Sequence, residues 1–151
     1  MKTSINRIII FGMLVLLLAA CAPEKLINPS QGAITIENPN SPQPGDGKLV
    51  RGEVEIVKTE LLFLKSNPLQ YGLNISFFTP TPCHQFRVSV DQPGSANRIN
   101  VGVYSLMKKD QVCALMRLNT PTEAFLVLSK VPIGHYSVWV NGEKAAEFDV
   151  L

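Results

Sequence analysis

Residues 131–150 read VPIGHYSVWVNGEKAAEFDV, and two features of this stretch decide the fold that the sequence predicts. Apolar and other side chains alternate through YSVWV at 136–140, which is the period of a half-buried β-strand. Asn141-Gly142 follows, and these residue types most readily adopt the positive φ that both centres of a type I′ turn require. A second alternating run, EFDV at 147–150, closes the chain. The stretch therefore predicts a β-hairpin.

The same two-residue period recurs along the chain, at YGLNISFF (71–78), FRVSV (86–90) and INVGV (99–103). Proline, glycine and asparagine clusters separate these runs at the spacing of short strands, and no stretch keeps a capped 3.6-residue period. Residues 52–66 are ambiguous between a long strand buried on both faces, a strand bent by a bulge, and a short helix. The run AITIE at 33–37 is a candidate edge strand.

Seven or eight short strands in about 100 residues predict an all-β chain folded as an antiparallel β-sandwich. The closing stretch also resembles the hairpin that ends many bacterial immunoglobulin-like and transthyretin-like extracellular modules. The resemblance rests on Pro132, Gly134, Tyr136, Val138, Val140, Asn141 and Gly142. It implies an immunoglobulin-like sandwich, and it bears on fold rather than on activity.

The amino-terminal residues have the pattern of an export signal. Lys2 and Arg7 precede an apolar core at 8–18, too short to span a bilayer permanently. The following Leu18-Ala19-Ala20-Cys21 resembles the lipobox of bacterial lipoproteins. The closing stretch at 131–150 and the two later cysteines, one after a proline-rich turn and one mid-domain, also resemble those of small bacterial envelope lipoproteins. The lipobox resemblance implies cleavage before Cys21, lipid attachment to its thiol, and anchoring in a membrane.

We therefore expect three parts: a lipoprotein signal peptide at 1–20, a lipidated tether rich in Pro, Asn and Gly at 21–48, and a β-sandwich domain at 49–151. Lys2 and Arg7 are two of 14 basic residues, so the mature part would hold 12, equal to the 12 acidic residues. This balance and the lack of a basic stripe argue against a nucleic-acid partner.

With Cys21 lipidated, Cys83 and Cys113 remain, and in an oxidising compartment two remaining cysteines are expected to pair. We expect this disulfide to tie two strands and to bury its sulfurs beside the core. The alternative is a reactive thiol at Cys83 beside His84, but neighbouring residues on an extended chain point to opposite faces.

No catalytic, metal or cofactor site can be nominated from the sequence, so we expect a protein that is not an enzyme. A candidate binding surface comes from the alternation of the strands. If Tyr136 and Val138 face the core, then His135 and Trp139 face outward, and Tyr104 does the same on another strand. Trp139 is either covered as a second core residue or exposed with Tyr104 as an aromatic pair that suits a sugar ring or a partner protein.

The expected function is that of a lipid-anchored cell-envelope module that serves as a binding or structural interaction domain. The membrane would be contacted through the lipid on Cys21, and the outer membrane is favoured if the cell has two, because Ala22 replaces the aspartate of an inner-membrane retention signal. The partner would be another envelope protein. The alternatives are a carbohydrate-binding module for a polysaccharide and an inhibitor of an exported protease.

Overall fold

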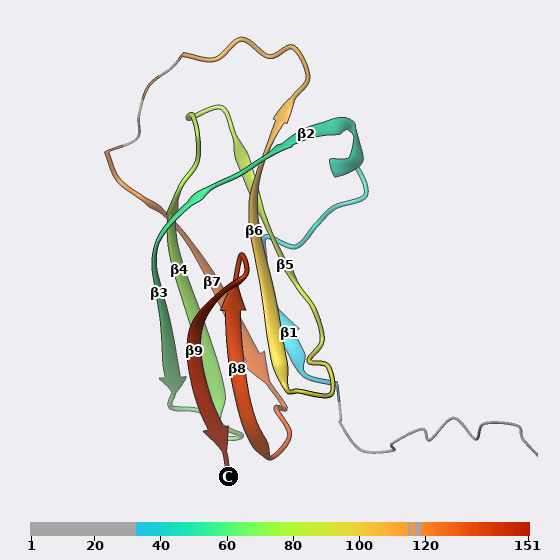
Figure 1. The fold of residues 1–151 in the computed structure, drawn as a ribbon, viewed down its shortest axis with the longest axis vertical. Coiled ribbons are helices and arrows are strands. Elements are labelled where there is room, and N and C mark those ends of the chain that lie inside the picture. Colours follow the sequence, from blue (N-terminus) through green and yellow to red (C-terminus); the bar gives the residue numbers. More distant parts are fainter. Residues whose placement is uncertain (1–32, 115, 117–118) are drawn as a thin grey trace, which may run out of the picture. The chain divides into compact units, whose positions relative to one another are not determined.

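The computed structural model describes residues 33–114, 116 and 119–151, which form a sandwich of two β-sheets (Figure 1). Cys21, the expected signal peptide and the first part of the expected tether lie outside the described residues. Within the described ranges no helix is long and apolar enough to cross a membrane. The elements in chain order are β1 (Thr35–Glu37), a 3-10 turn η1 (Asp46–Lys48), β2 (Leu49–Gly52), β3 (Glu55–Leu64), β4 (Gln70–Phe78), β5 (Gln85–Val90), β6 (Arg98–Lys108), β7 (Thr122–Ser129), β8 (Gly134–Val140) and β9 (Glu143–Val150).

The two sheets differ in the number and order of their strands. One sheet has four antiparallel strands in the order β1-β7-β4-β3. The other has five, in the order β2-β6-β8-β9, with β5 paired to the opposite edge of β6. The pair β6 and β8 is parallel, and the other pairs among the described strands are antiparallel. The predicted all-β sandwich is confirmed, and β1 and the short β2 bring the described strands above the expected number.

The core lies between the sheets and is made by the alternation that the sequence shows. Every residue that the sequence placed on the inner face of the runs at 71–78, 99–103 and 136–140 is at most 4% exposed. Phe148 of β9 joins them, with its ring centroid 4.4 Å from that of Tyr71 and 5.4 Å from that of Tyr136. The fully buried large side chains are Tyr71, Leu73, Ile75, Phe77, Val88, Ile99, Leu126, Leu128, Tyr136 and Val138.

The ambiguous stretch 52–66 contains one long strand, β3, with a register shift between Ile56 and Lys58. The bulge places Val57 at 52% exposure on the edge of the four-stranded sheet. Of the three alternatives, the strand bent by a bulge is therefore confirmed. The continuous apolar run of β3 does not reflect burial on both faces of the strand. Its side chains, one of them an aromatic ring, lie at an exposed edge of the sheet.

Residues 33–48, expected to be tether, are part of the folded domain, so the boundary expected at 49 is corrected to an earlier position. Ile34 is 2% exposed, and β1 pairs with β7. Beyond β1, the Asn38 side chain donates to the carbonyl of Val88 at 2.6 Å, so this segment covers the free edge of β5. Arg87 of β5 then holds η1 through both oxygens of the Asp46 carboxylate, at 2.9 and 3.1 Å.

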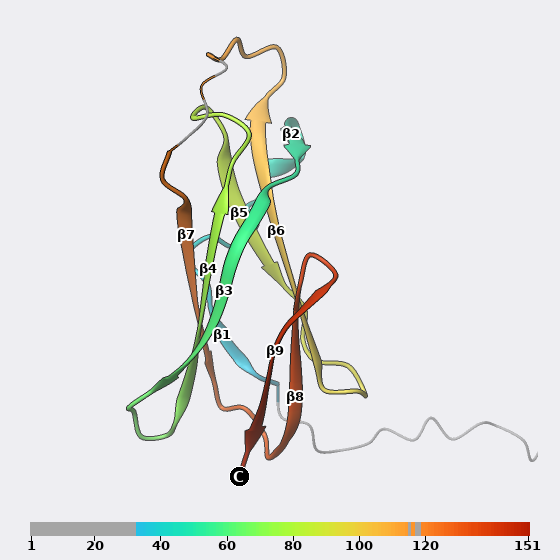
Figure 2. The ribbon, with the colours of Figure 1, turned by 60° about the vertical axis from the view of Figure 1, so that its left-hand side comes forward.

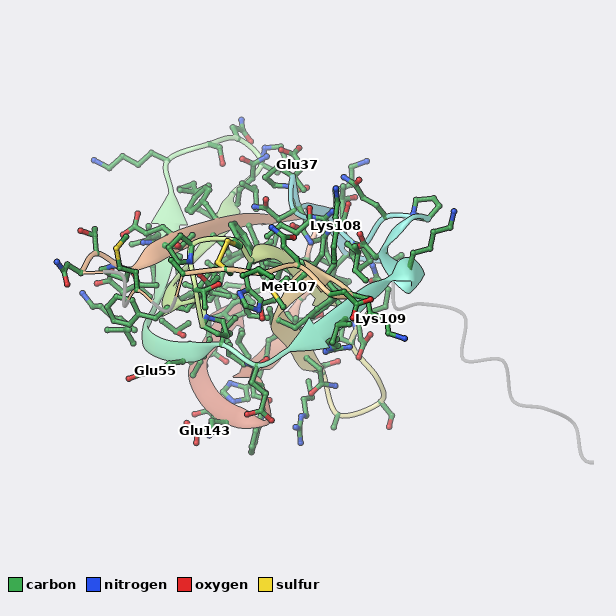
Figure 3. All side chains as sticks on the ribbon, turned by 90° about the horizontal axis from the view of Figure 1, so that it is seen from above. Glu37, Glu55, Met107, Lys108, Lys109 and Glu143 are labelled. Atoms are coloured by element: carbon green, nitrogen blue, oxygen red, sulfur yellow. A yellow bond between two sulfur atoms is a disulfide. The ribbon has the colours of Figure 1, made fainter. Side chains whose placement is uncertain are left out.

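The expected disulfide between Cys83 and Cys113 is confirmed, with Cα atoms 6.1 Å apart. Its position is corrected, because it joins the loop before β5 to the loop after β6 and does not tie the strands themselves. Both cysteines are half-buried at the end of the sandwich where β6 finishes at Lys108 and Lys109 follows (Figure 3). A bridge across 30 residues of sequence stabilises the fold by about 3–4 kcal/mol on the chain-entropy argument.

One edge of β6 has two strand partners with a gap between them. β8 pairs with residues 98–101, and β2 pairs with residues 105–108. Asn141 fills the gap: its side-chain amide accepts from the N–H of Val103 at 2.8 Å and donates to the carbonyl of Val103 at 3.0 Å. The side chain thus takes the place of a strand for one residue. It can do so because Asn141 and Gly142 have positive φ, 49° and 91°, which confirms the predicted hairpin turn.

Replacing Asn141 by glycine tests this amide bridge. Asn141→Gly keeps a residue suited to positive φ but leaves the backbone of Val103 without both bonds, so we expect a loss of about 1–2 kcal/mol in the free energy of unfolding. Asn141→Asp can accept from Val103 but cannot donate, and its loss should be intermediate. Denaturant titrations of the three proteins measure the order. A glycine variant as stable as the parent would contradict the bridge.

Candidate binding surface

His135, Trp139 and Tyr104 lie on the same face of the molecule, the outer face of the five-stranded sheet (Figure 2 shows β6, β8 and β9 side by side). Alternate side chains of β8 are buried in the core, so the residues between them, including His135 and Trp139, point to the outer face. Tyr104 of β6 points outward for the same reason. The shared face that the sequence predicted is thus present. The rings do not form one pair: Trp139 is level with Asn100 of β6, which is four residues, or about 13 Å, along the strand from Tyr104.

Trp139 is half-buried on this face, and an arginine side chain covers its ring. The guanidinium carbon of Arg98 lies 3.9 Å from the ring centroid, and the indole N–H donates to the Ser137 hydroxyl at 3.2 Å. The ring is therefore neither a core residue nor an open platform. An arginine stacked in this way contributes about 0.5–1 kcal/mol at an exposed site.

Tyr104 repeats the arrangement. Tyr104 is only 8% exposed, and the guanidinium carbon of Arg51 lies 3.7 Å above its ring centroid. Tyr104 belongs to β6 and Arg51 to β2, whose pairing with β6 brings the two side chains together on the outer face. The expectation of an exposed aromatic pair is corrected: each ring is capped by a cation.

The two arginines are the residues that sequence reasoning missed. Neither guanidinium makes a salt bridge to a carboxylate among the described residues, although Arg98 donates from Nε to the Asn100 side chain at 2.7 Å. Arg98 could have been found from the alternation of β6, because it precedes the inward-facing Ile99 by one residue. Arg51 gave no such signal, because β2 was not predicted as a strand.

A groove adjoins Tyr104 where β6 lacks a full strand partner. It has a volume of about 680 Å³ and is lined by Arg51, Gly52, Glu53, Val54, Val103, Tyr104 and Asn141. A second hollow of about 470 Å³ shares Val54 and Asn141 with it and continues between β3 and β9. Both hollows are partly open to solvent and neither is an enclosed cavity, so they suit a contact with an extended surface better than enclosure of a small molecule.

His135 stands at the far edge of this face in a ladder of charged side chains. Its Nδ1–H donates to Asp149 of β9 at 2.8 Å, and its Nε2 lies 3.7 Å from Glu147. Lys144 pairs with the same Glu147. The hydrogen bond to Asp149 is the main reason that the pKa of His135 is raised above its ordinary 6.5. This corner of the face is therefore occupied by its own ion pairs.

The other histidine lies near the disulfide but does not approach Cys83 as a base. His84 Nδ1 is 2.8 Å from the hydroxyl of Thr81, which is itself 3.1 Å from the sulfur of Cys113. The reactive-thiol alternative is contradicted because Cys83 is bonded to Cys113. In the part of the chain that the structure describes, no three His, Cys, Asp or Glu side chains are grouped as metal ligands would be.

The fold and its site define an all-β sandwich protein with a polar, arginine-bearing sheet face. Within that class, residues 73–150 match the ORF11 beta-sandwich domain, and the chain belongs to this family. The matched segment includes Cys83, Cys113 and all three predicted surface residues. No curated protein and no solved structure matches the chain significantly.

The pKa of His135 gives a direct test of the charged ladder. Because the folded-state pKa is raised, the ladder adds stability below pH 6.5 and loses that contribution as the pH rises through the folded-state pKa. An NMR titration of the imidazole should show a midpoint above 6.5, and Asp149→Asn should lower it. Glu123→Gln, on the outer face of the other sheet, is the matched control and should leave the midpoint unchanged. An unaltered midpoint in the Asp149 variant would contradict the assigned cause.

Proposed function

We propose that this protein is a lipid-anchored module of the cell envelope that binds a partner protein through the outer face of its five-stranded sheet. The anchor is the lipid on Cys21, and the bound surface of the partner is acidic. The proposal assigns no catalytic step to the chain. The observation that carries it is the pair of arginines, Arg51 and Arg98, each held over an aromatic ring on this face, with an open groove beside Arg51.

The proposed location rests on the amino-terminal sequence and on the disulfide. The basic start, short apolar core and Leu18-Ala19-Ala20-Cys21 resemble a lipoprotein signal. The bridge between Cys83 and Cys113 favours an oxidising, extracytoplasmic compartment, because cytosolic thiols are kept reduced. If the cell has two membranes, the residue after the cysteine favours the outer one.

The proposed partner chemistry follows from the arginines. A guanidinium held over a ring carries N–H groups that can donate in pairs to a carboxylate. Its side-chain entropy is already reduced by the stacking, so less is lost on binding. The two guanidinium groups lie over rings that are about 13 Å apart along β6. That separation fits an extended protein surface better than a single small ligand.

The two alternatives are less well supported. A carbohydrate module would stack sugar rings on Trp139 and Tyr104, but these ring faces are covered by guanidinium groups. A protease inhibitor would present an extended, exposed loop. The proline-rich loop before β5 is instead compact, with Thr79 and Thr81 buried and hydrogen-bonded to each other through the Thr79 hydroxyl.

The anchor is tested by Cys21→Ser. A serine hydroxyl cannot replace the thiol as lipid acceptor, so metabolic labelling with a radioactive fatty acid should mark the parent protein and not the variant. The parent should also partition with membranes after cell breakage. Fatty-acid label at full strength in the Cys21 variant would remove the lipoprotein assignment.

The binding face is tested with the intact lipoprotein and a cross-linker applied to whole envelopes. Replacing Arg51 and Arg98 by alanine should weaken capture of the cross-linked partner by about tenfold or more per arginine, because each removes a charge-assisted contact. Lys109→Ala is the matched control, since it removes an exposed cation at the disulfide-bearing end, outside both hollows. Loss of capture in the Lys109 variant, or undiminished capture in the arginine variants, would contradict the assigned face. A glycan array probed with the same proteins distinguishes the carbohydrate-binding alternative from a protein partner, because only that alternative predicts binding to a polysaccharide.

A further inference from the structure

Three loops and the start of the described chain meet at one end of the sandwich, the lower end in Figure 1. Thr35 is paired with Ser129, so β1 begins beside the loop at 130–133. The loop at 91–97 is joined to the residue before β1, because the Gln92 side chain exchanges two hydrogen bonds with the backbone of Ile34, at 2.9 and 3.0 Å. The loop at 65–69 is at this end as well, between β3 and β4. We call these residues the anchor-side end, because the chain leads from here toward Cys21.

The anchor-side end exposes large apolar side chains on two of its loops and on the strand leading into one of them. Ile133 is 81% exposed, Phe63 is 62% exposed and Leu69 is 50% exposed. Lys65 and Lys130 are exposed on the same two loops, and Asp91 is the exposed acid of the third. Large apolar side chains with lysines beside them are the composition that enters the headgroup region of a bilayer.

The reach of the tether selects this end over the opposite one. Eleven residues, 22–32, lie between the anchoring cysteine and the described chain. Even when fully extended, a segment of that length spans at most about 40 Å. β6 alone has 11 residues, or about 36 Å. The anchor-side end is therefore held close to the bilayer, at a high effective concentration, whereas the other end is held away from it unless the domain turns over.

We propose that the anchor-side end rests on the lipid bilayer that holds the anchor, with Ile133, Leu69 and Phe63 in the interfacial layer and Lys65 and Lys130 at lipid phosphates. This inference rests on the proposed lipid anchor and specifies how the domain is oriented on it. Both sheet faces then stand upright from the membrane, and the disulfide-bearing end points away. The arginine face remains open to a partner alongside.

The opposite end provides the comparison that makes the proposal testable. It also exposes apolar side chains, with Val112 96% exposed in the loop after β6, and it carries Lys108 and Lys109 (Figure 3). Composition alone would therefore allow either end to meet the membrane. Only the position of the tether distinguishes them, so the two ends are expected to behave differently although their side chains are similar.

The experiment uses the full-length lipidated protein in vesicles of phosphatidylethanolamine and phosphatidylglycerol. An introduced cysteine is a free thiol for labelling, because Cys21 is acylated and Cys83 is paired with Cys113. Ile133→Cys and Leu69→Cys are labelled with an environment-sensitive fluorophore, and Val112→Cys is the matched control at the other end. We expect blue-shifted emission at 133 and 69 and quenching there by lipids with nitroxide-bearing acyl chains. The label at 112 should keep the emission of a probe in water.

Fatty-acid labelling and flotation of the same samples separate the two proposals. If the protein floats with the vesicles but the labels at 133 and 69 behave like the label at 112, the orientation is overturned and the anchor stands. Equal quenching at both ends also overturns it, because the domain would then lie on its side. If the protein carries no fatty acid and does not float, the anchor itself is overturned.

Discussion

The edge of β6 is the constraint on which the arrangement of this sandwich depends. β6 pairs with β5 along one edge, while its other edge is divided between the parallel strand β8 and the antiparallel strand β2. Two strands running in opposite directions along one edge cannot join without a break, and the break falls at Val103. The Asn141 amide satisfies the backbone there, so a residue of the β8–β9 turn holds the sheet together where regular pairing stops.

The same division of β6 builds the candidate surface. β8 places Trp139 beside one end of β6, where Arg98 covers it, and β2 places Arg51 over Tyr104 near the other end. The groove beside Tyr104 is the space left between the two partner strands. A continuous partner strand would fill this space with backbone. The incomplete edge and the arginine-capped rings are therefore two results of one topological feature.

The part of this architecture that the sequence predicted is the part that depends on neighbouring residues. The alternation at 71–78, 99–103 and 136–140 specifies which side chains are buried, and Asn141-Gly142 specifies its own turn. The strand neighbours depend instead on pairing between distant segments, which no local pattern encodes. The composition of 33–48 suggested a tether because proline, asparagine and glycine dominate it. The segment is nevertheless held by three contacts that only the fold provides: pairing of β1, the Asn38 bond to β5, and the ion pair of Asp46 with Arg87.

Those contacts also show that the family match does not mark the limits of a folding unit. The match at 73–150 begins inside β4, so it omits β1 and β3, which are the two edge strands of the four-stranded sheet. Without them β4 and β7 would each expose an unpaired edge, and Ile34 would be missing from the core. The family match also covers only part of the candidate face, because Arg98 and Trp139 lie within the matched segment and Arg51 precedes it. The amino-terminal segment therefore completes both the sandwich and the surface through which we propose that it binds.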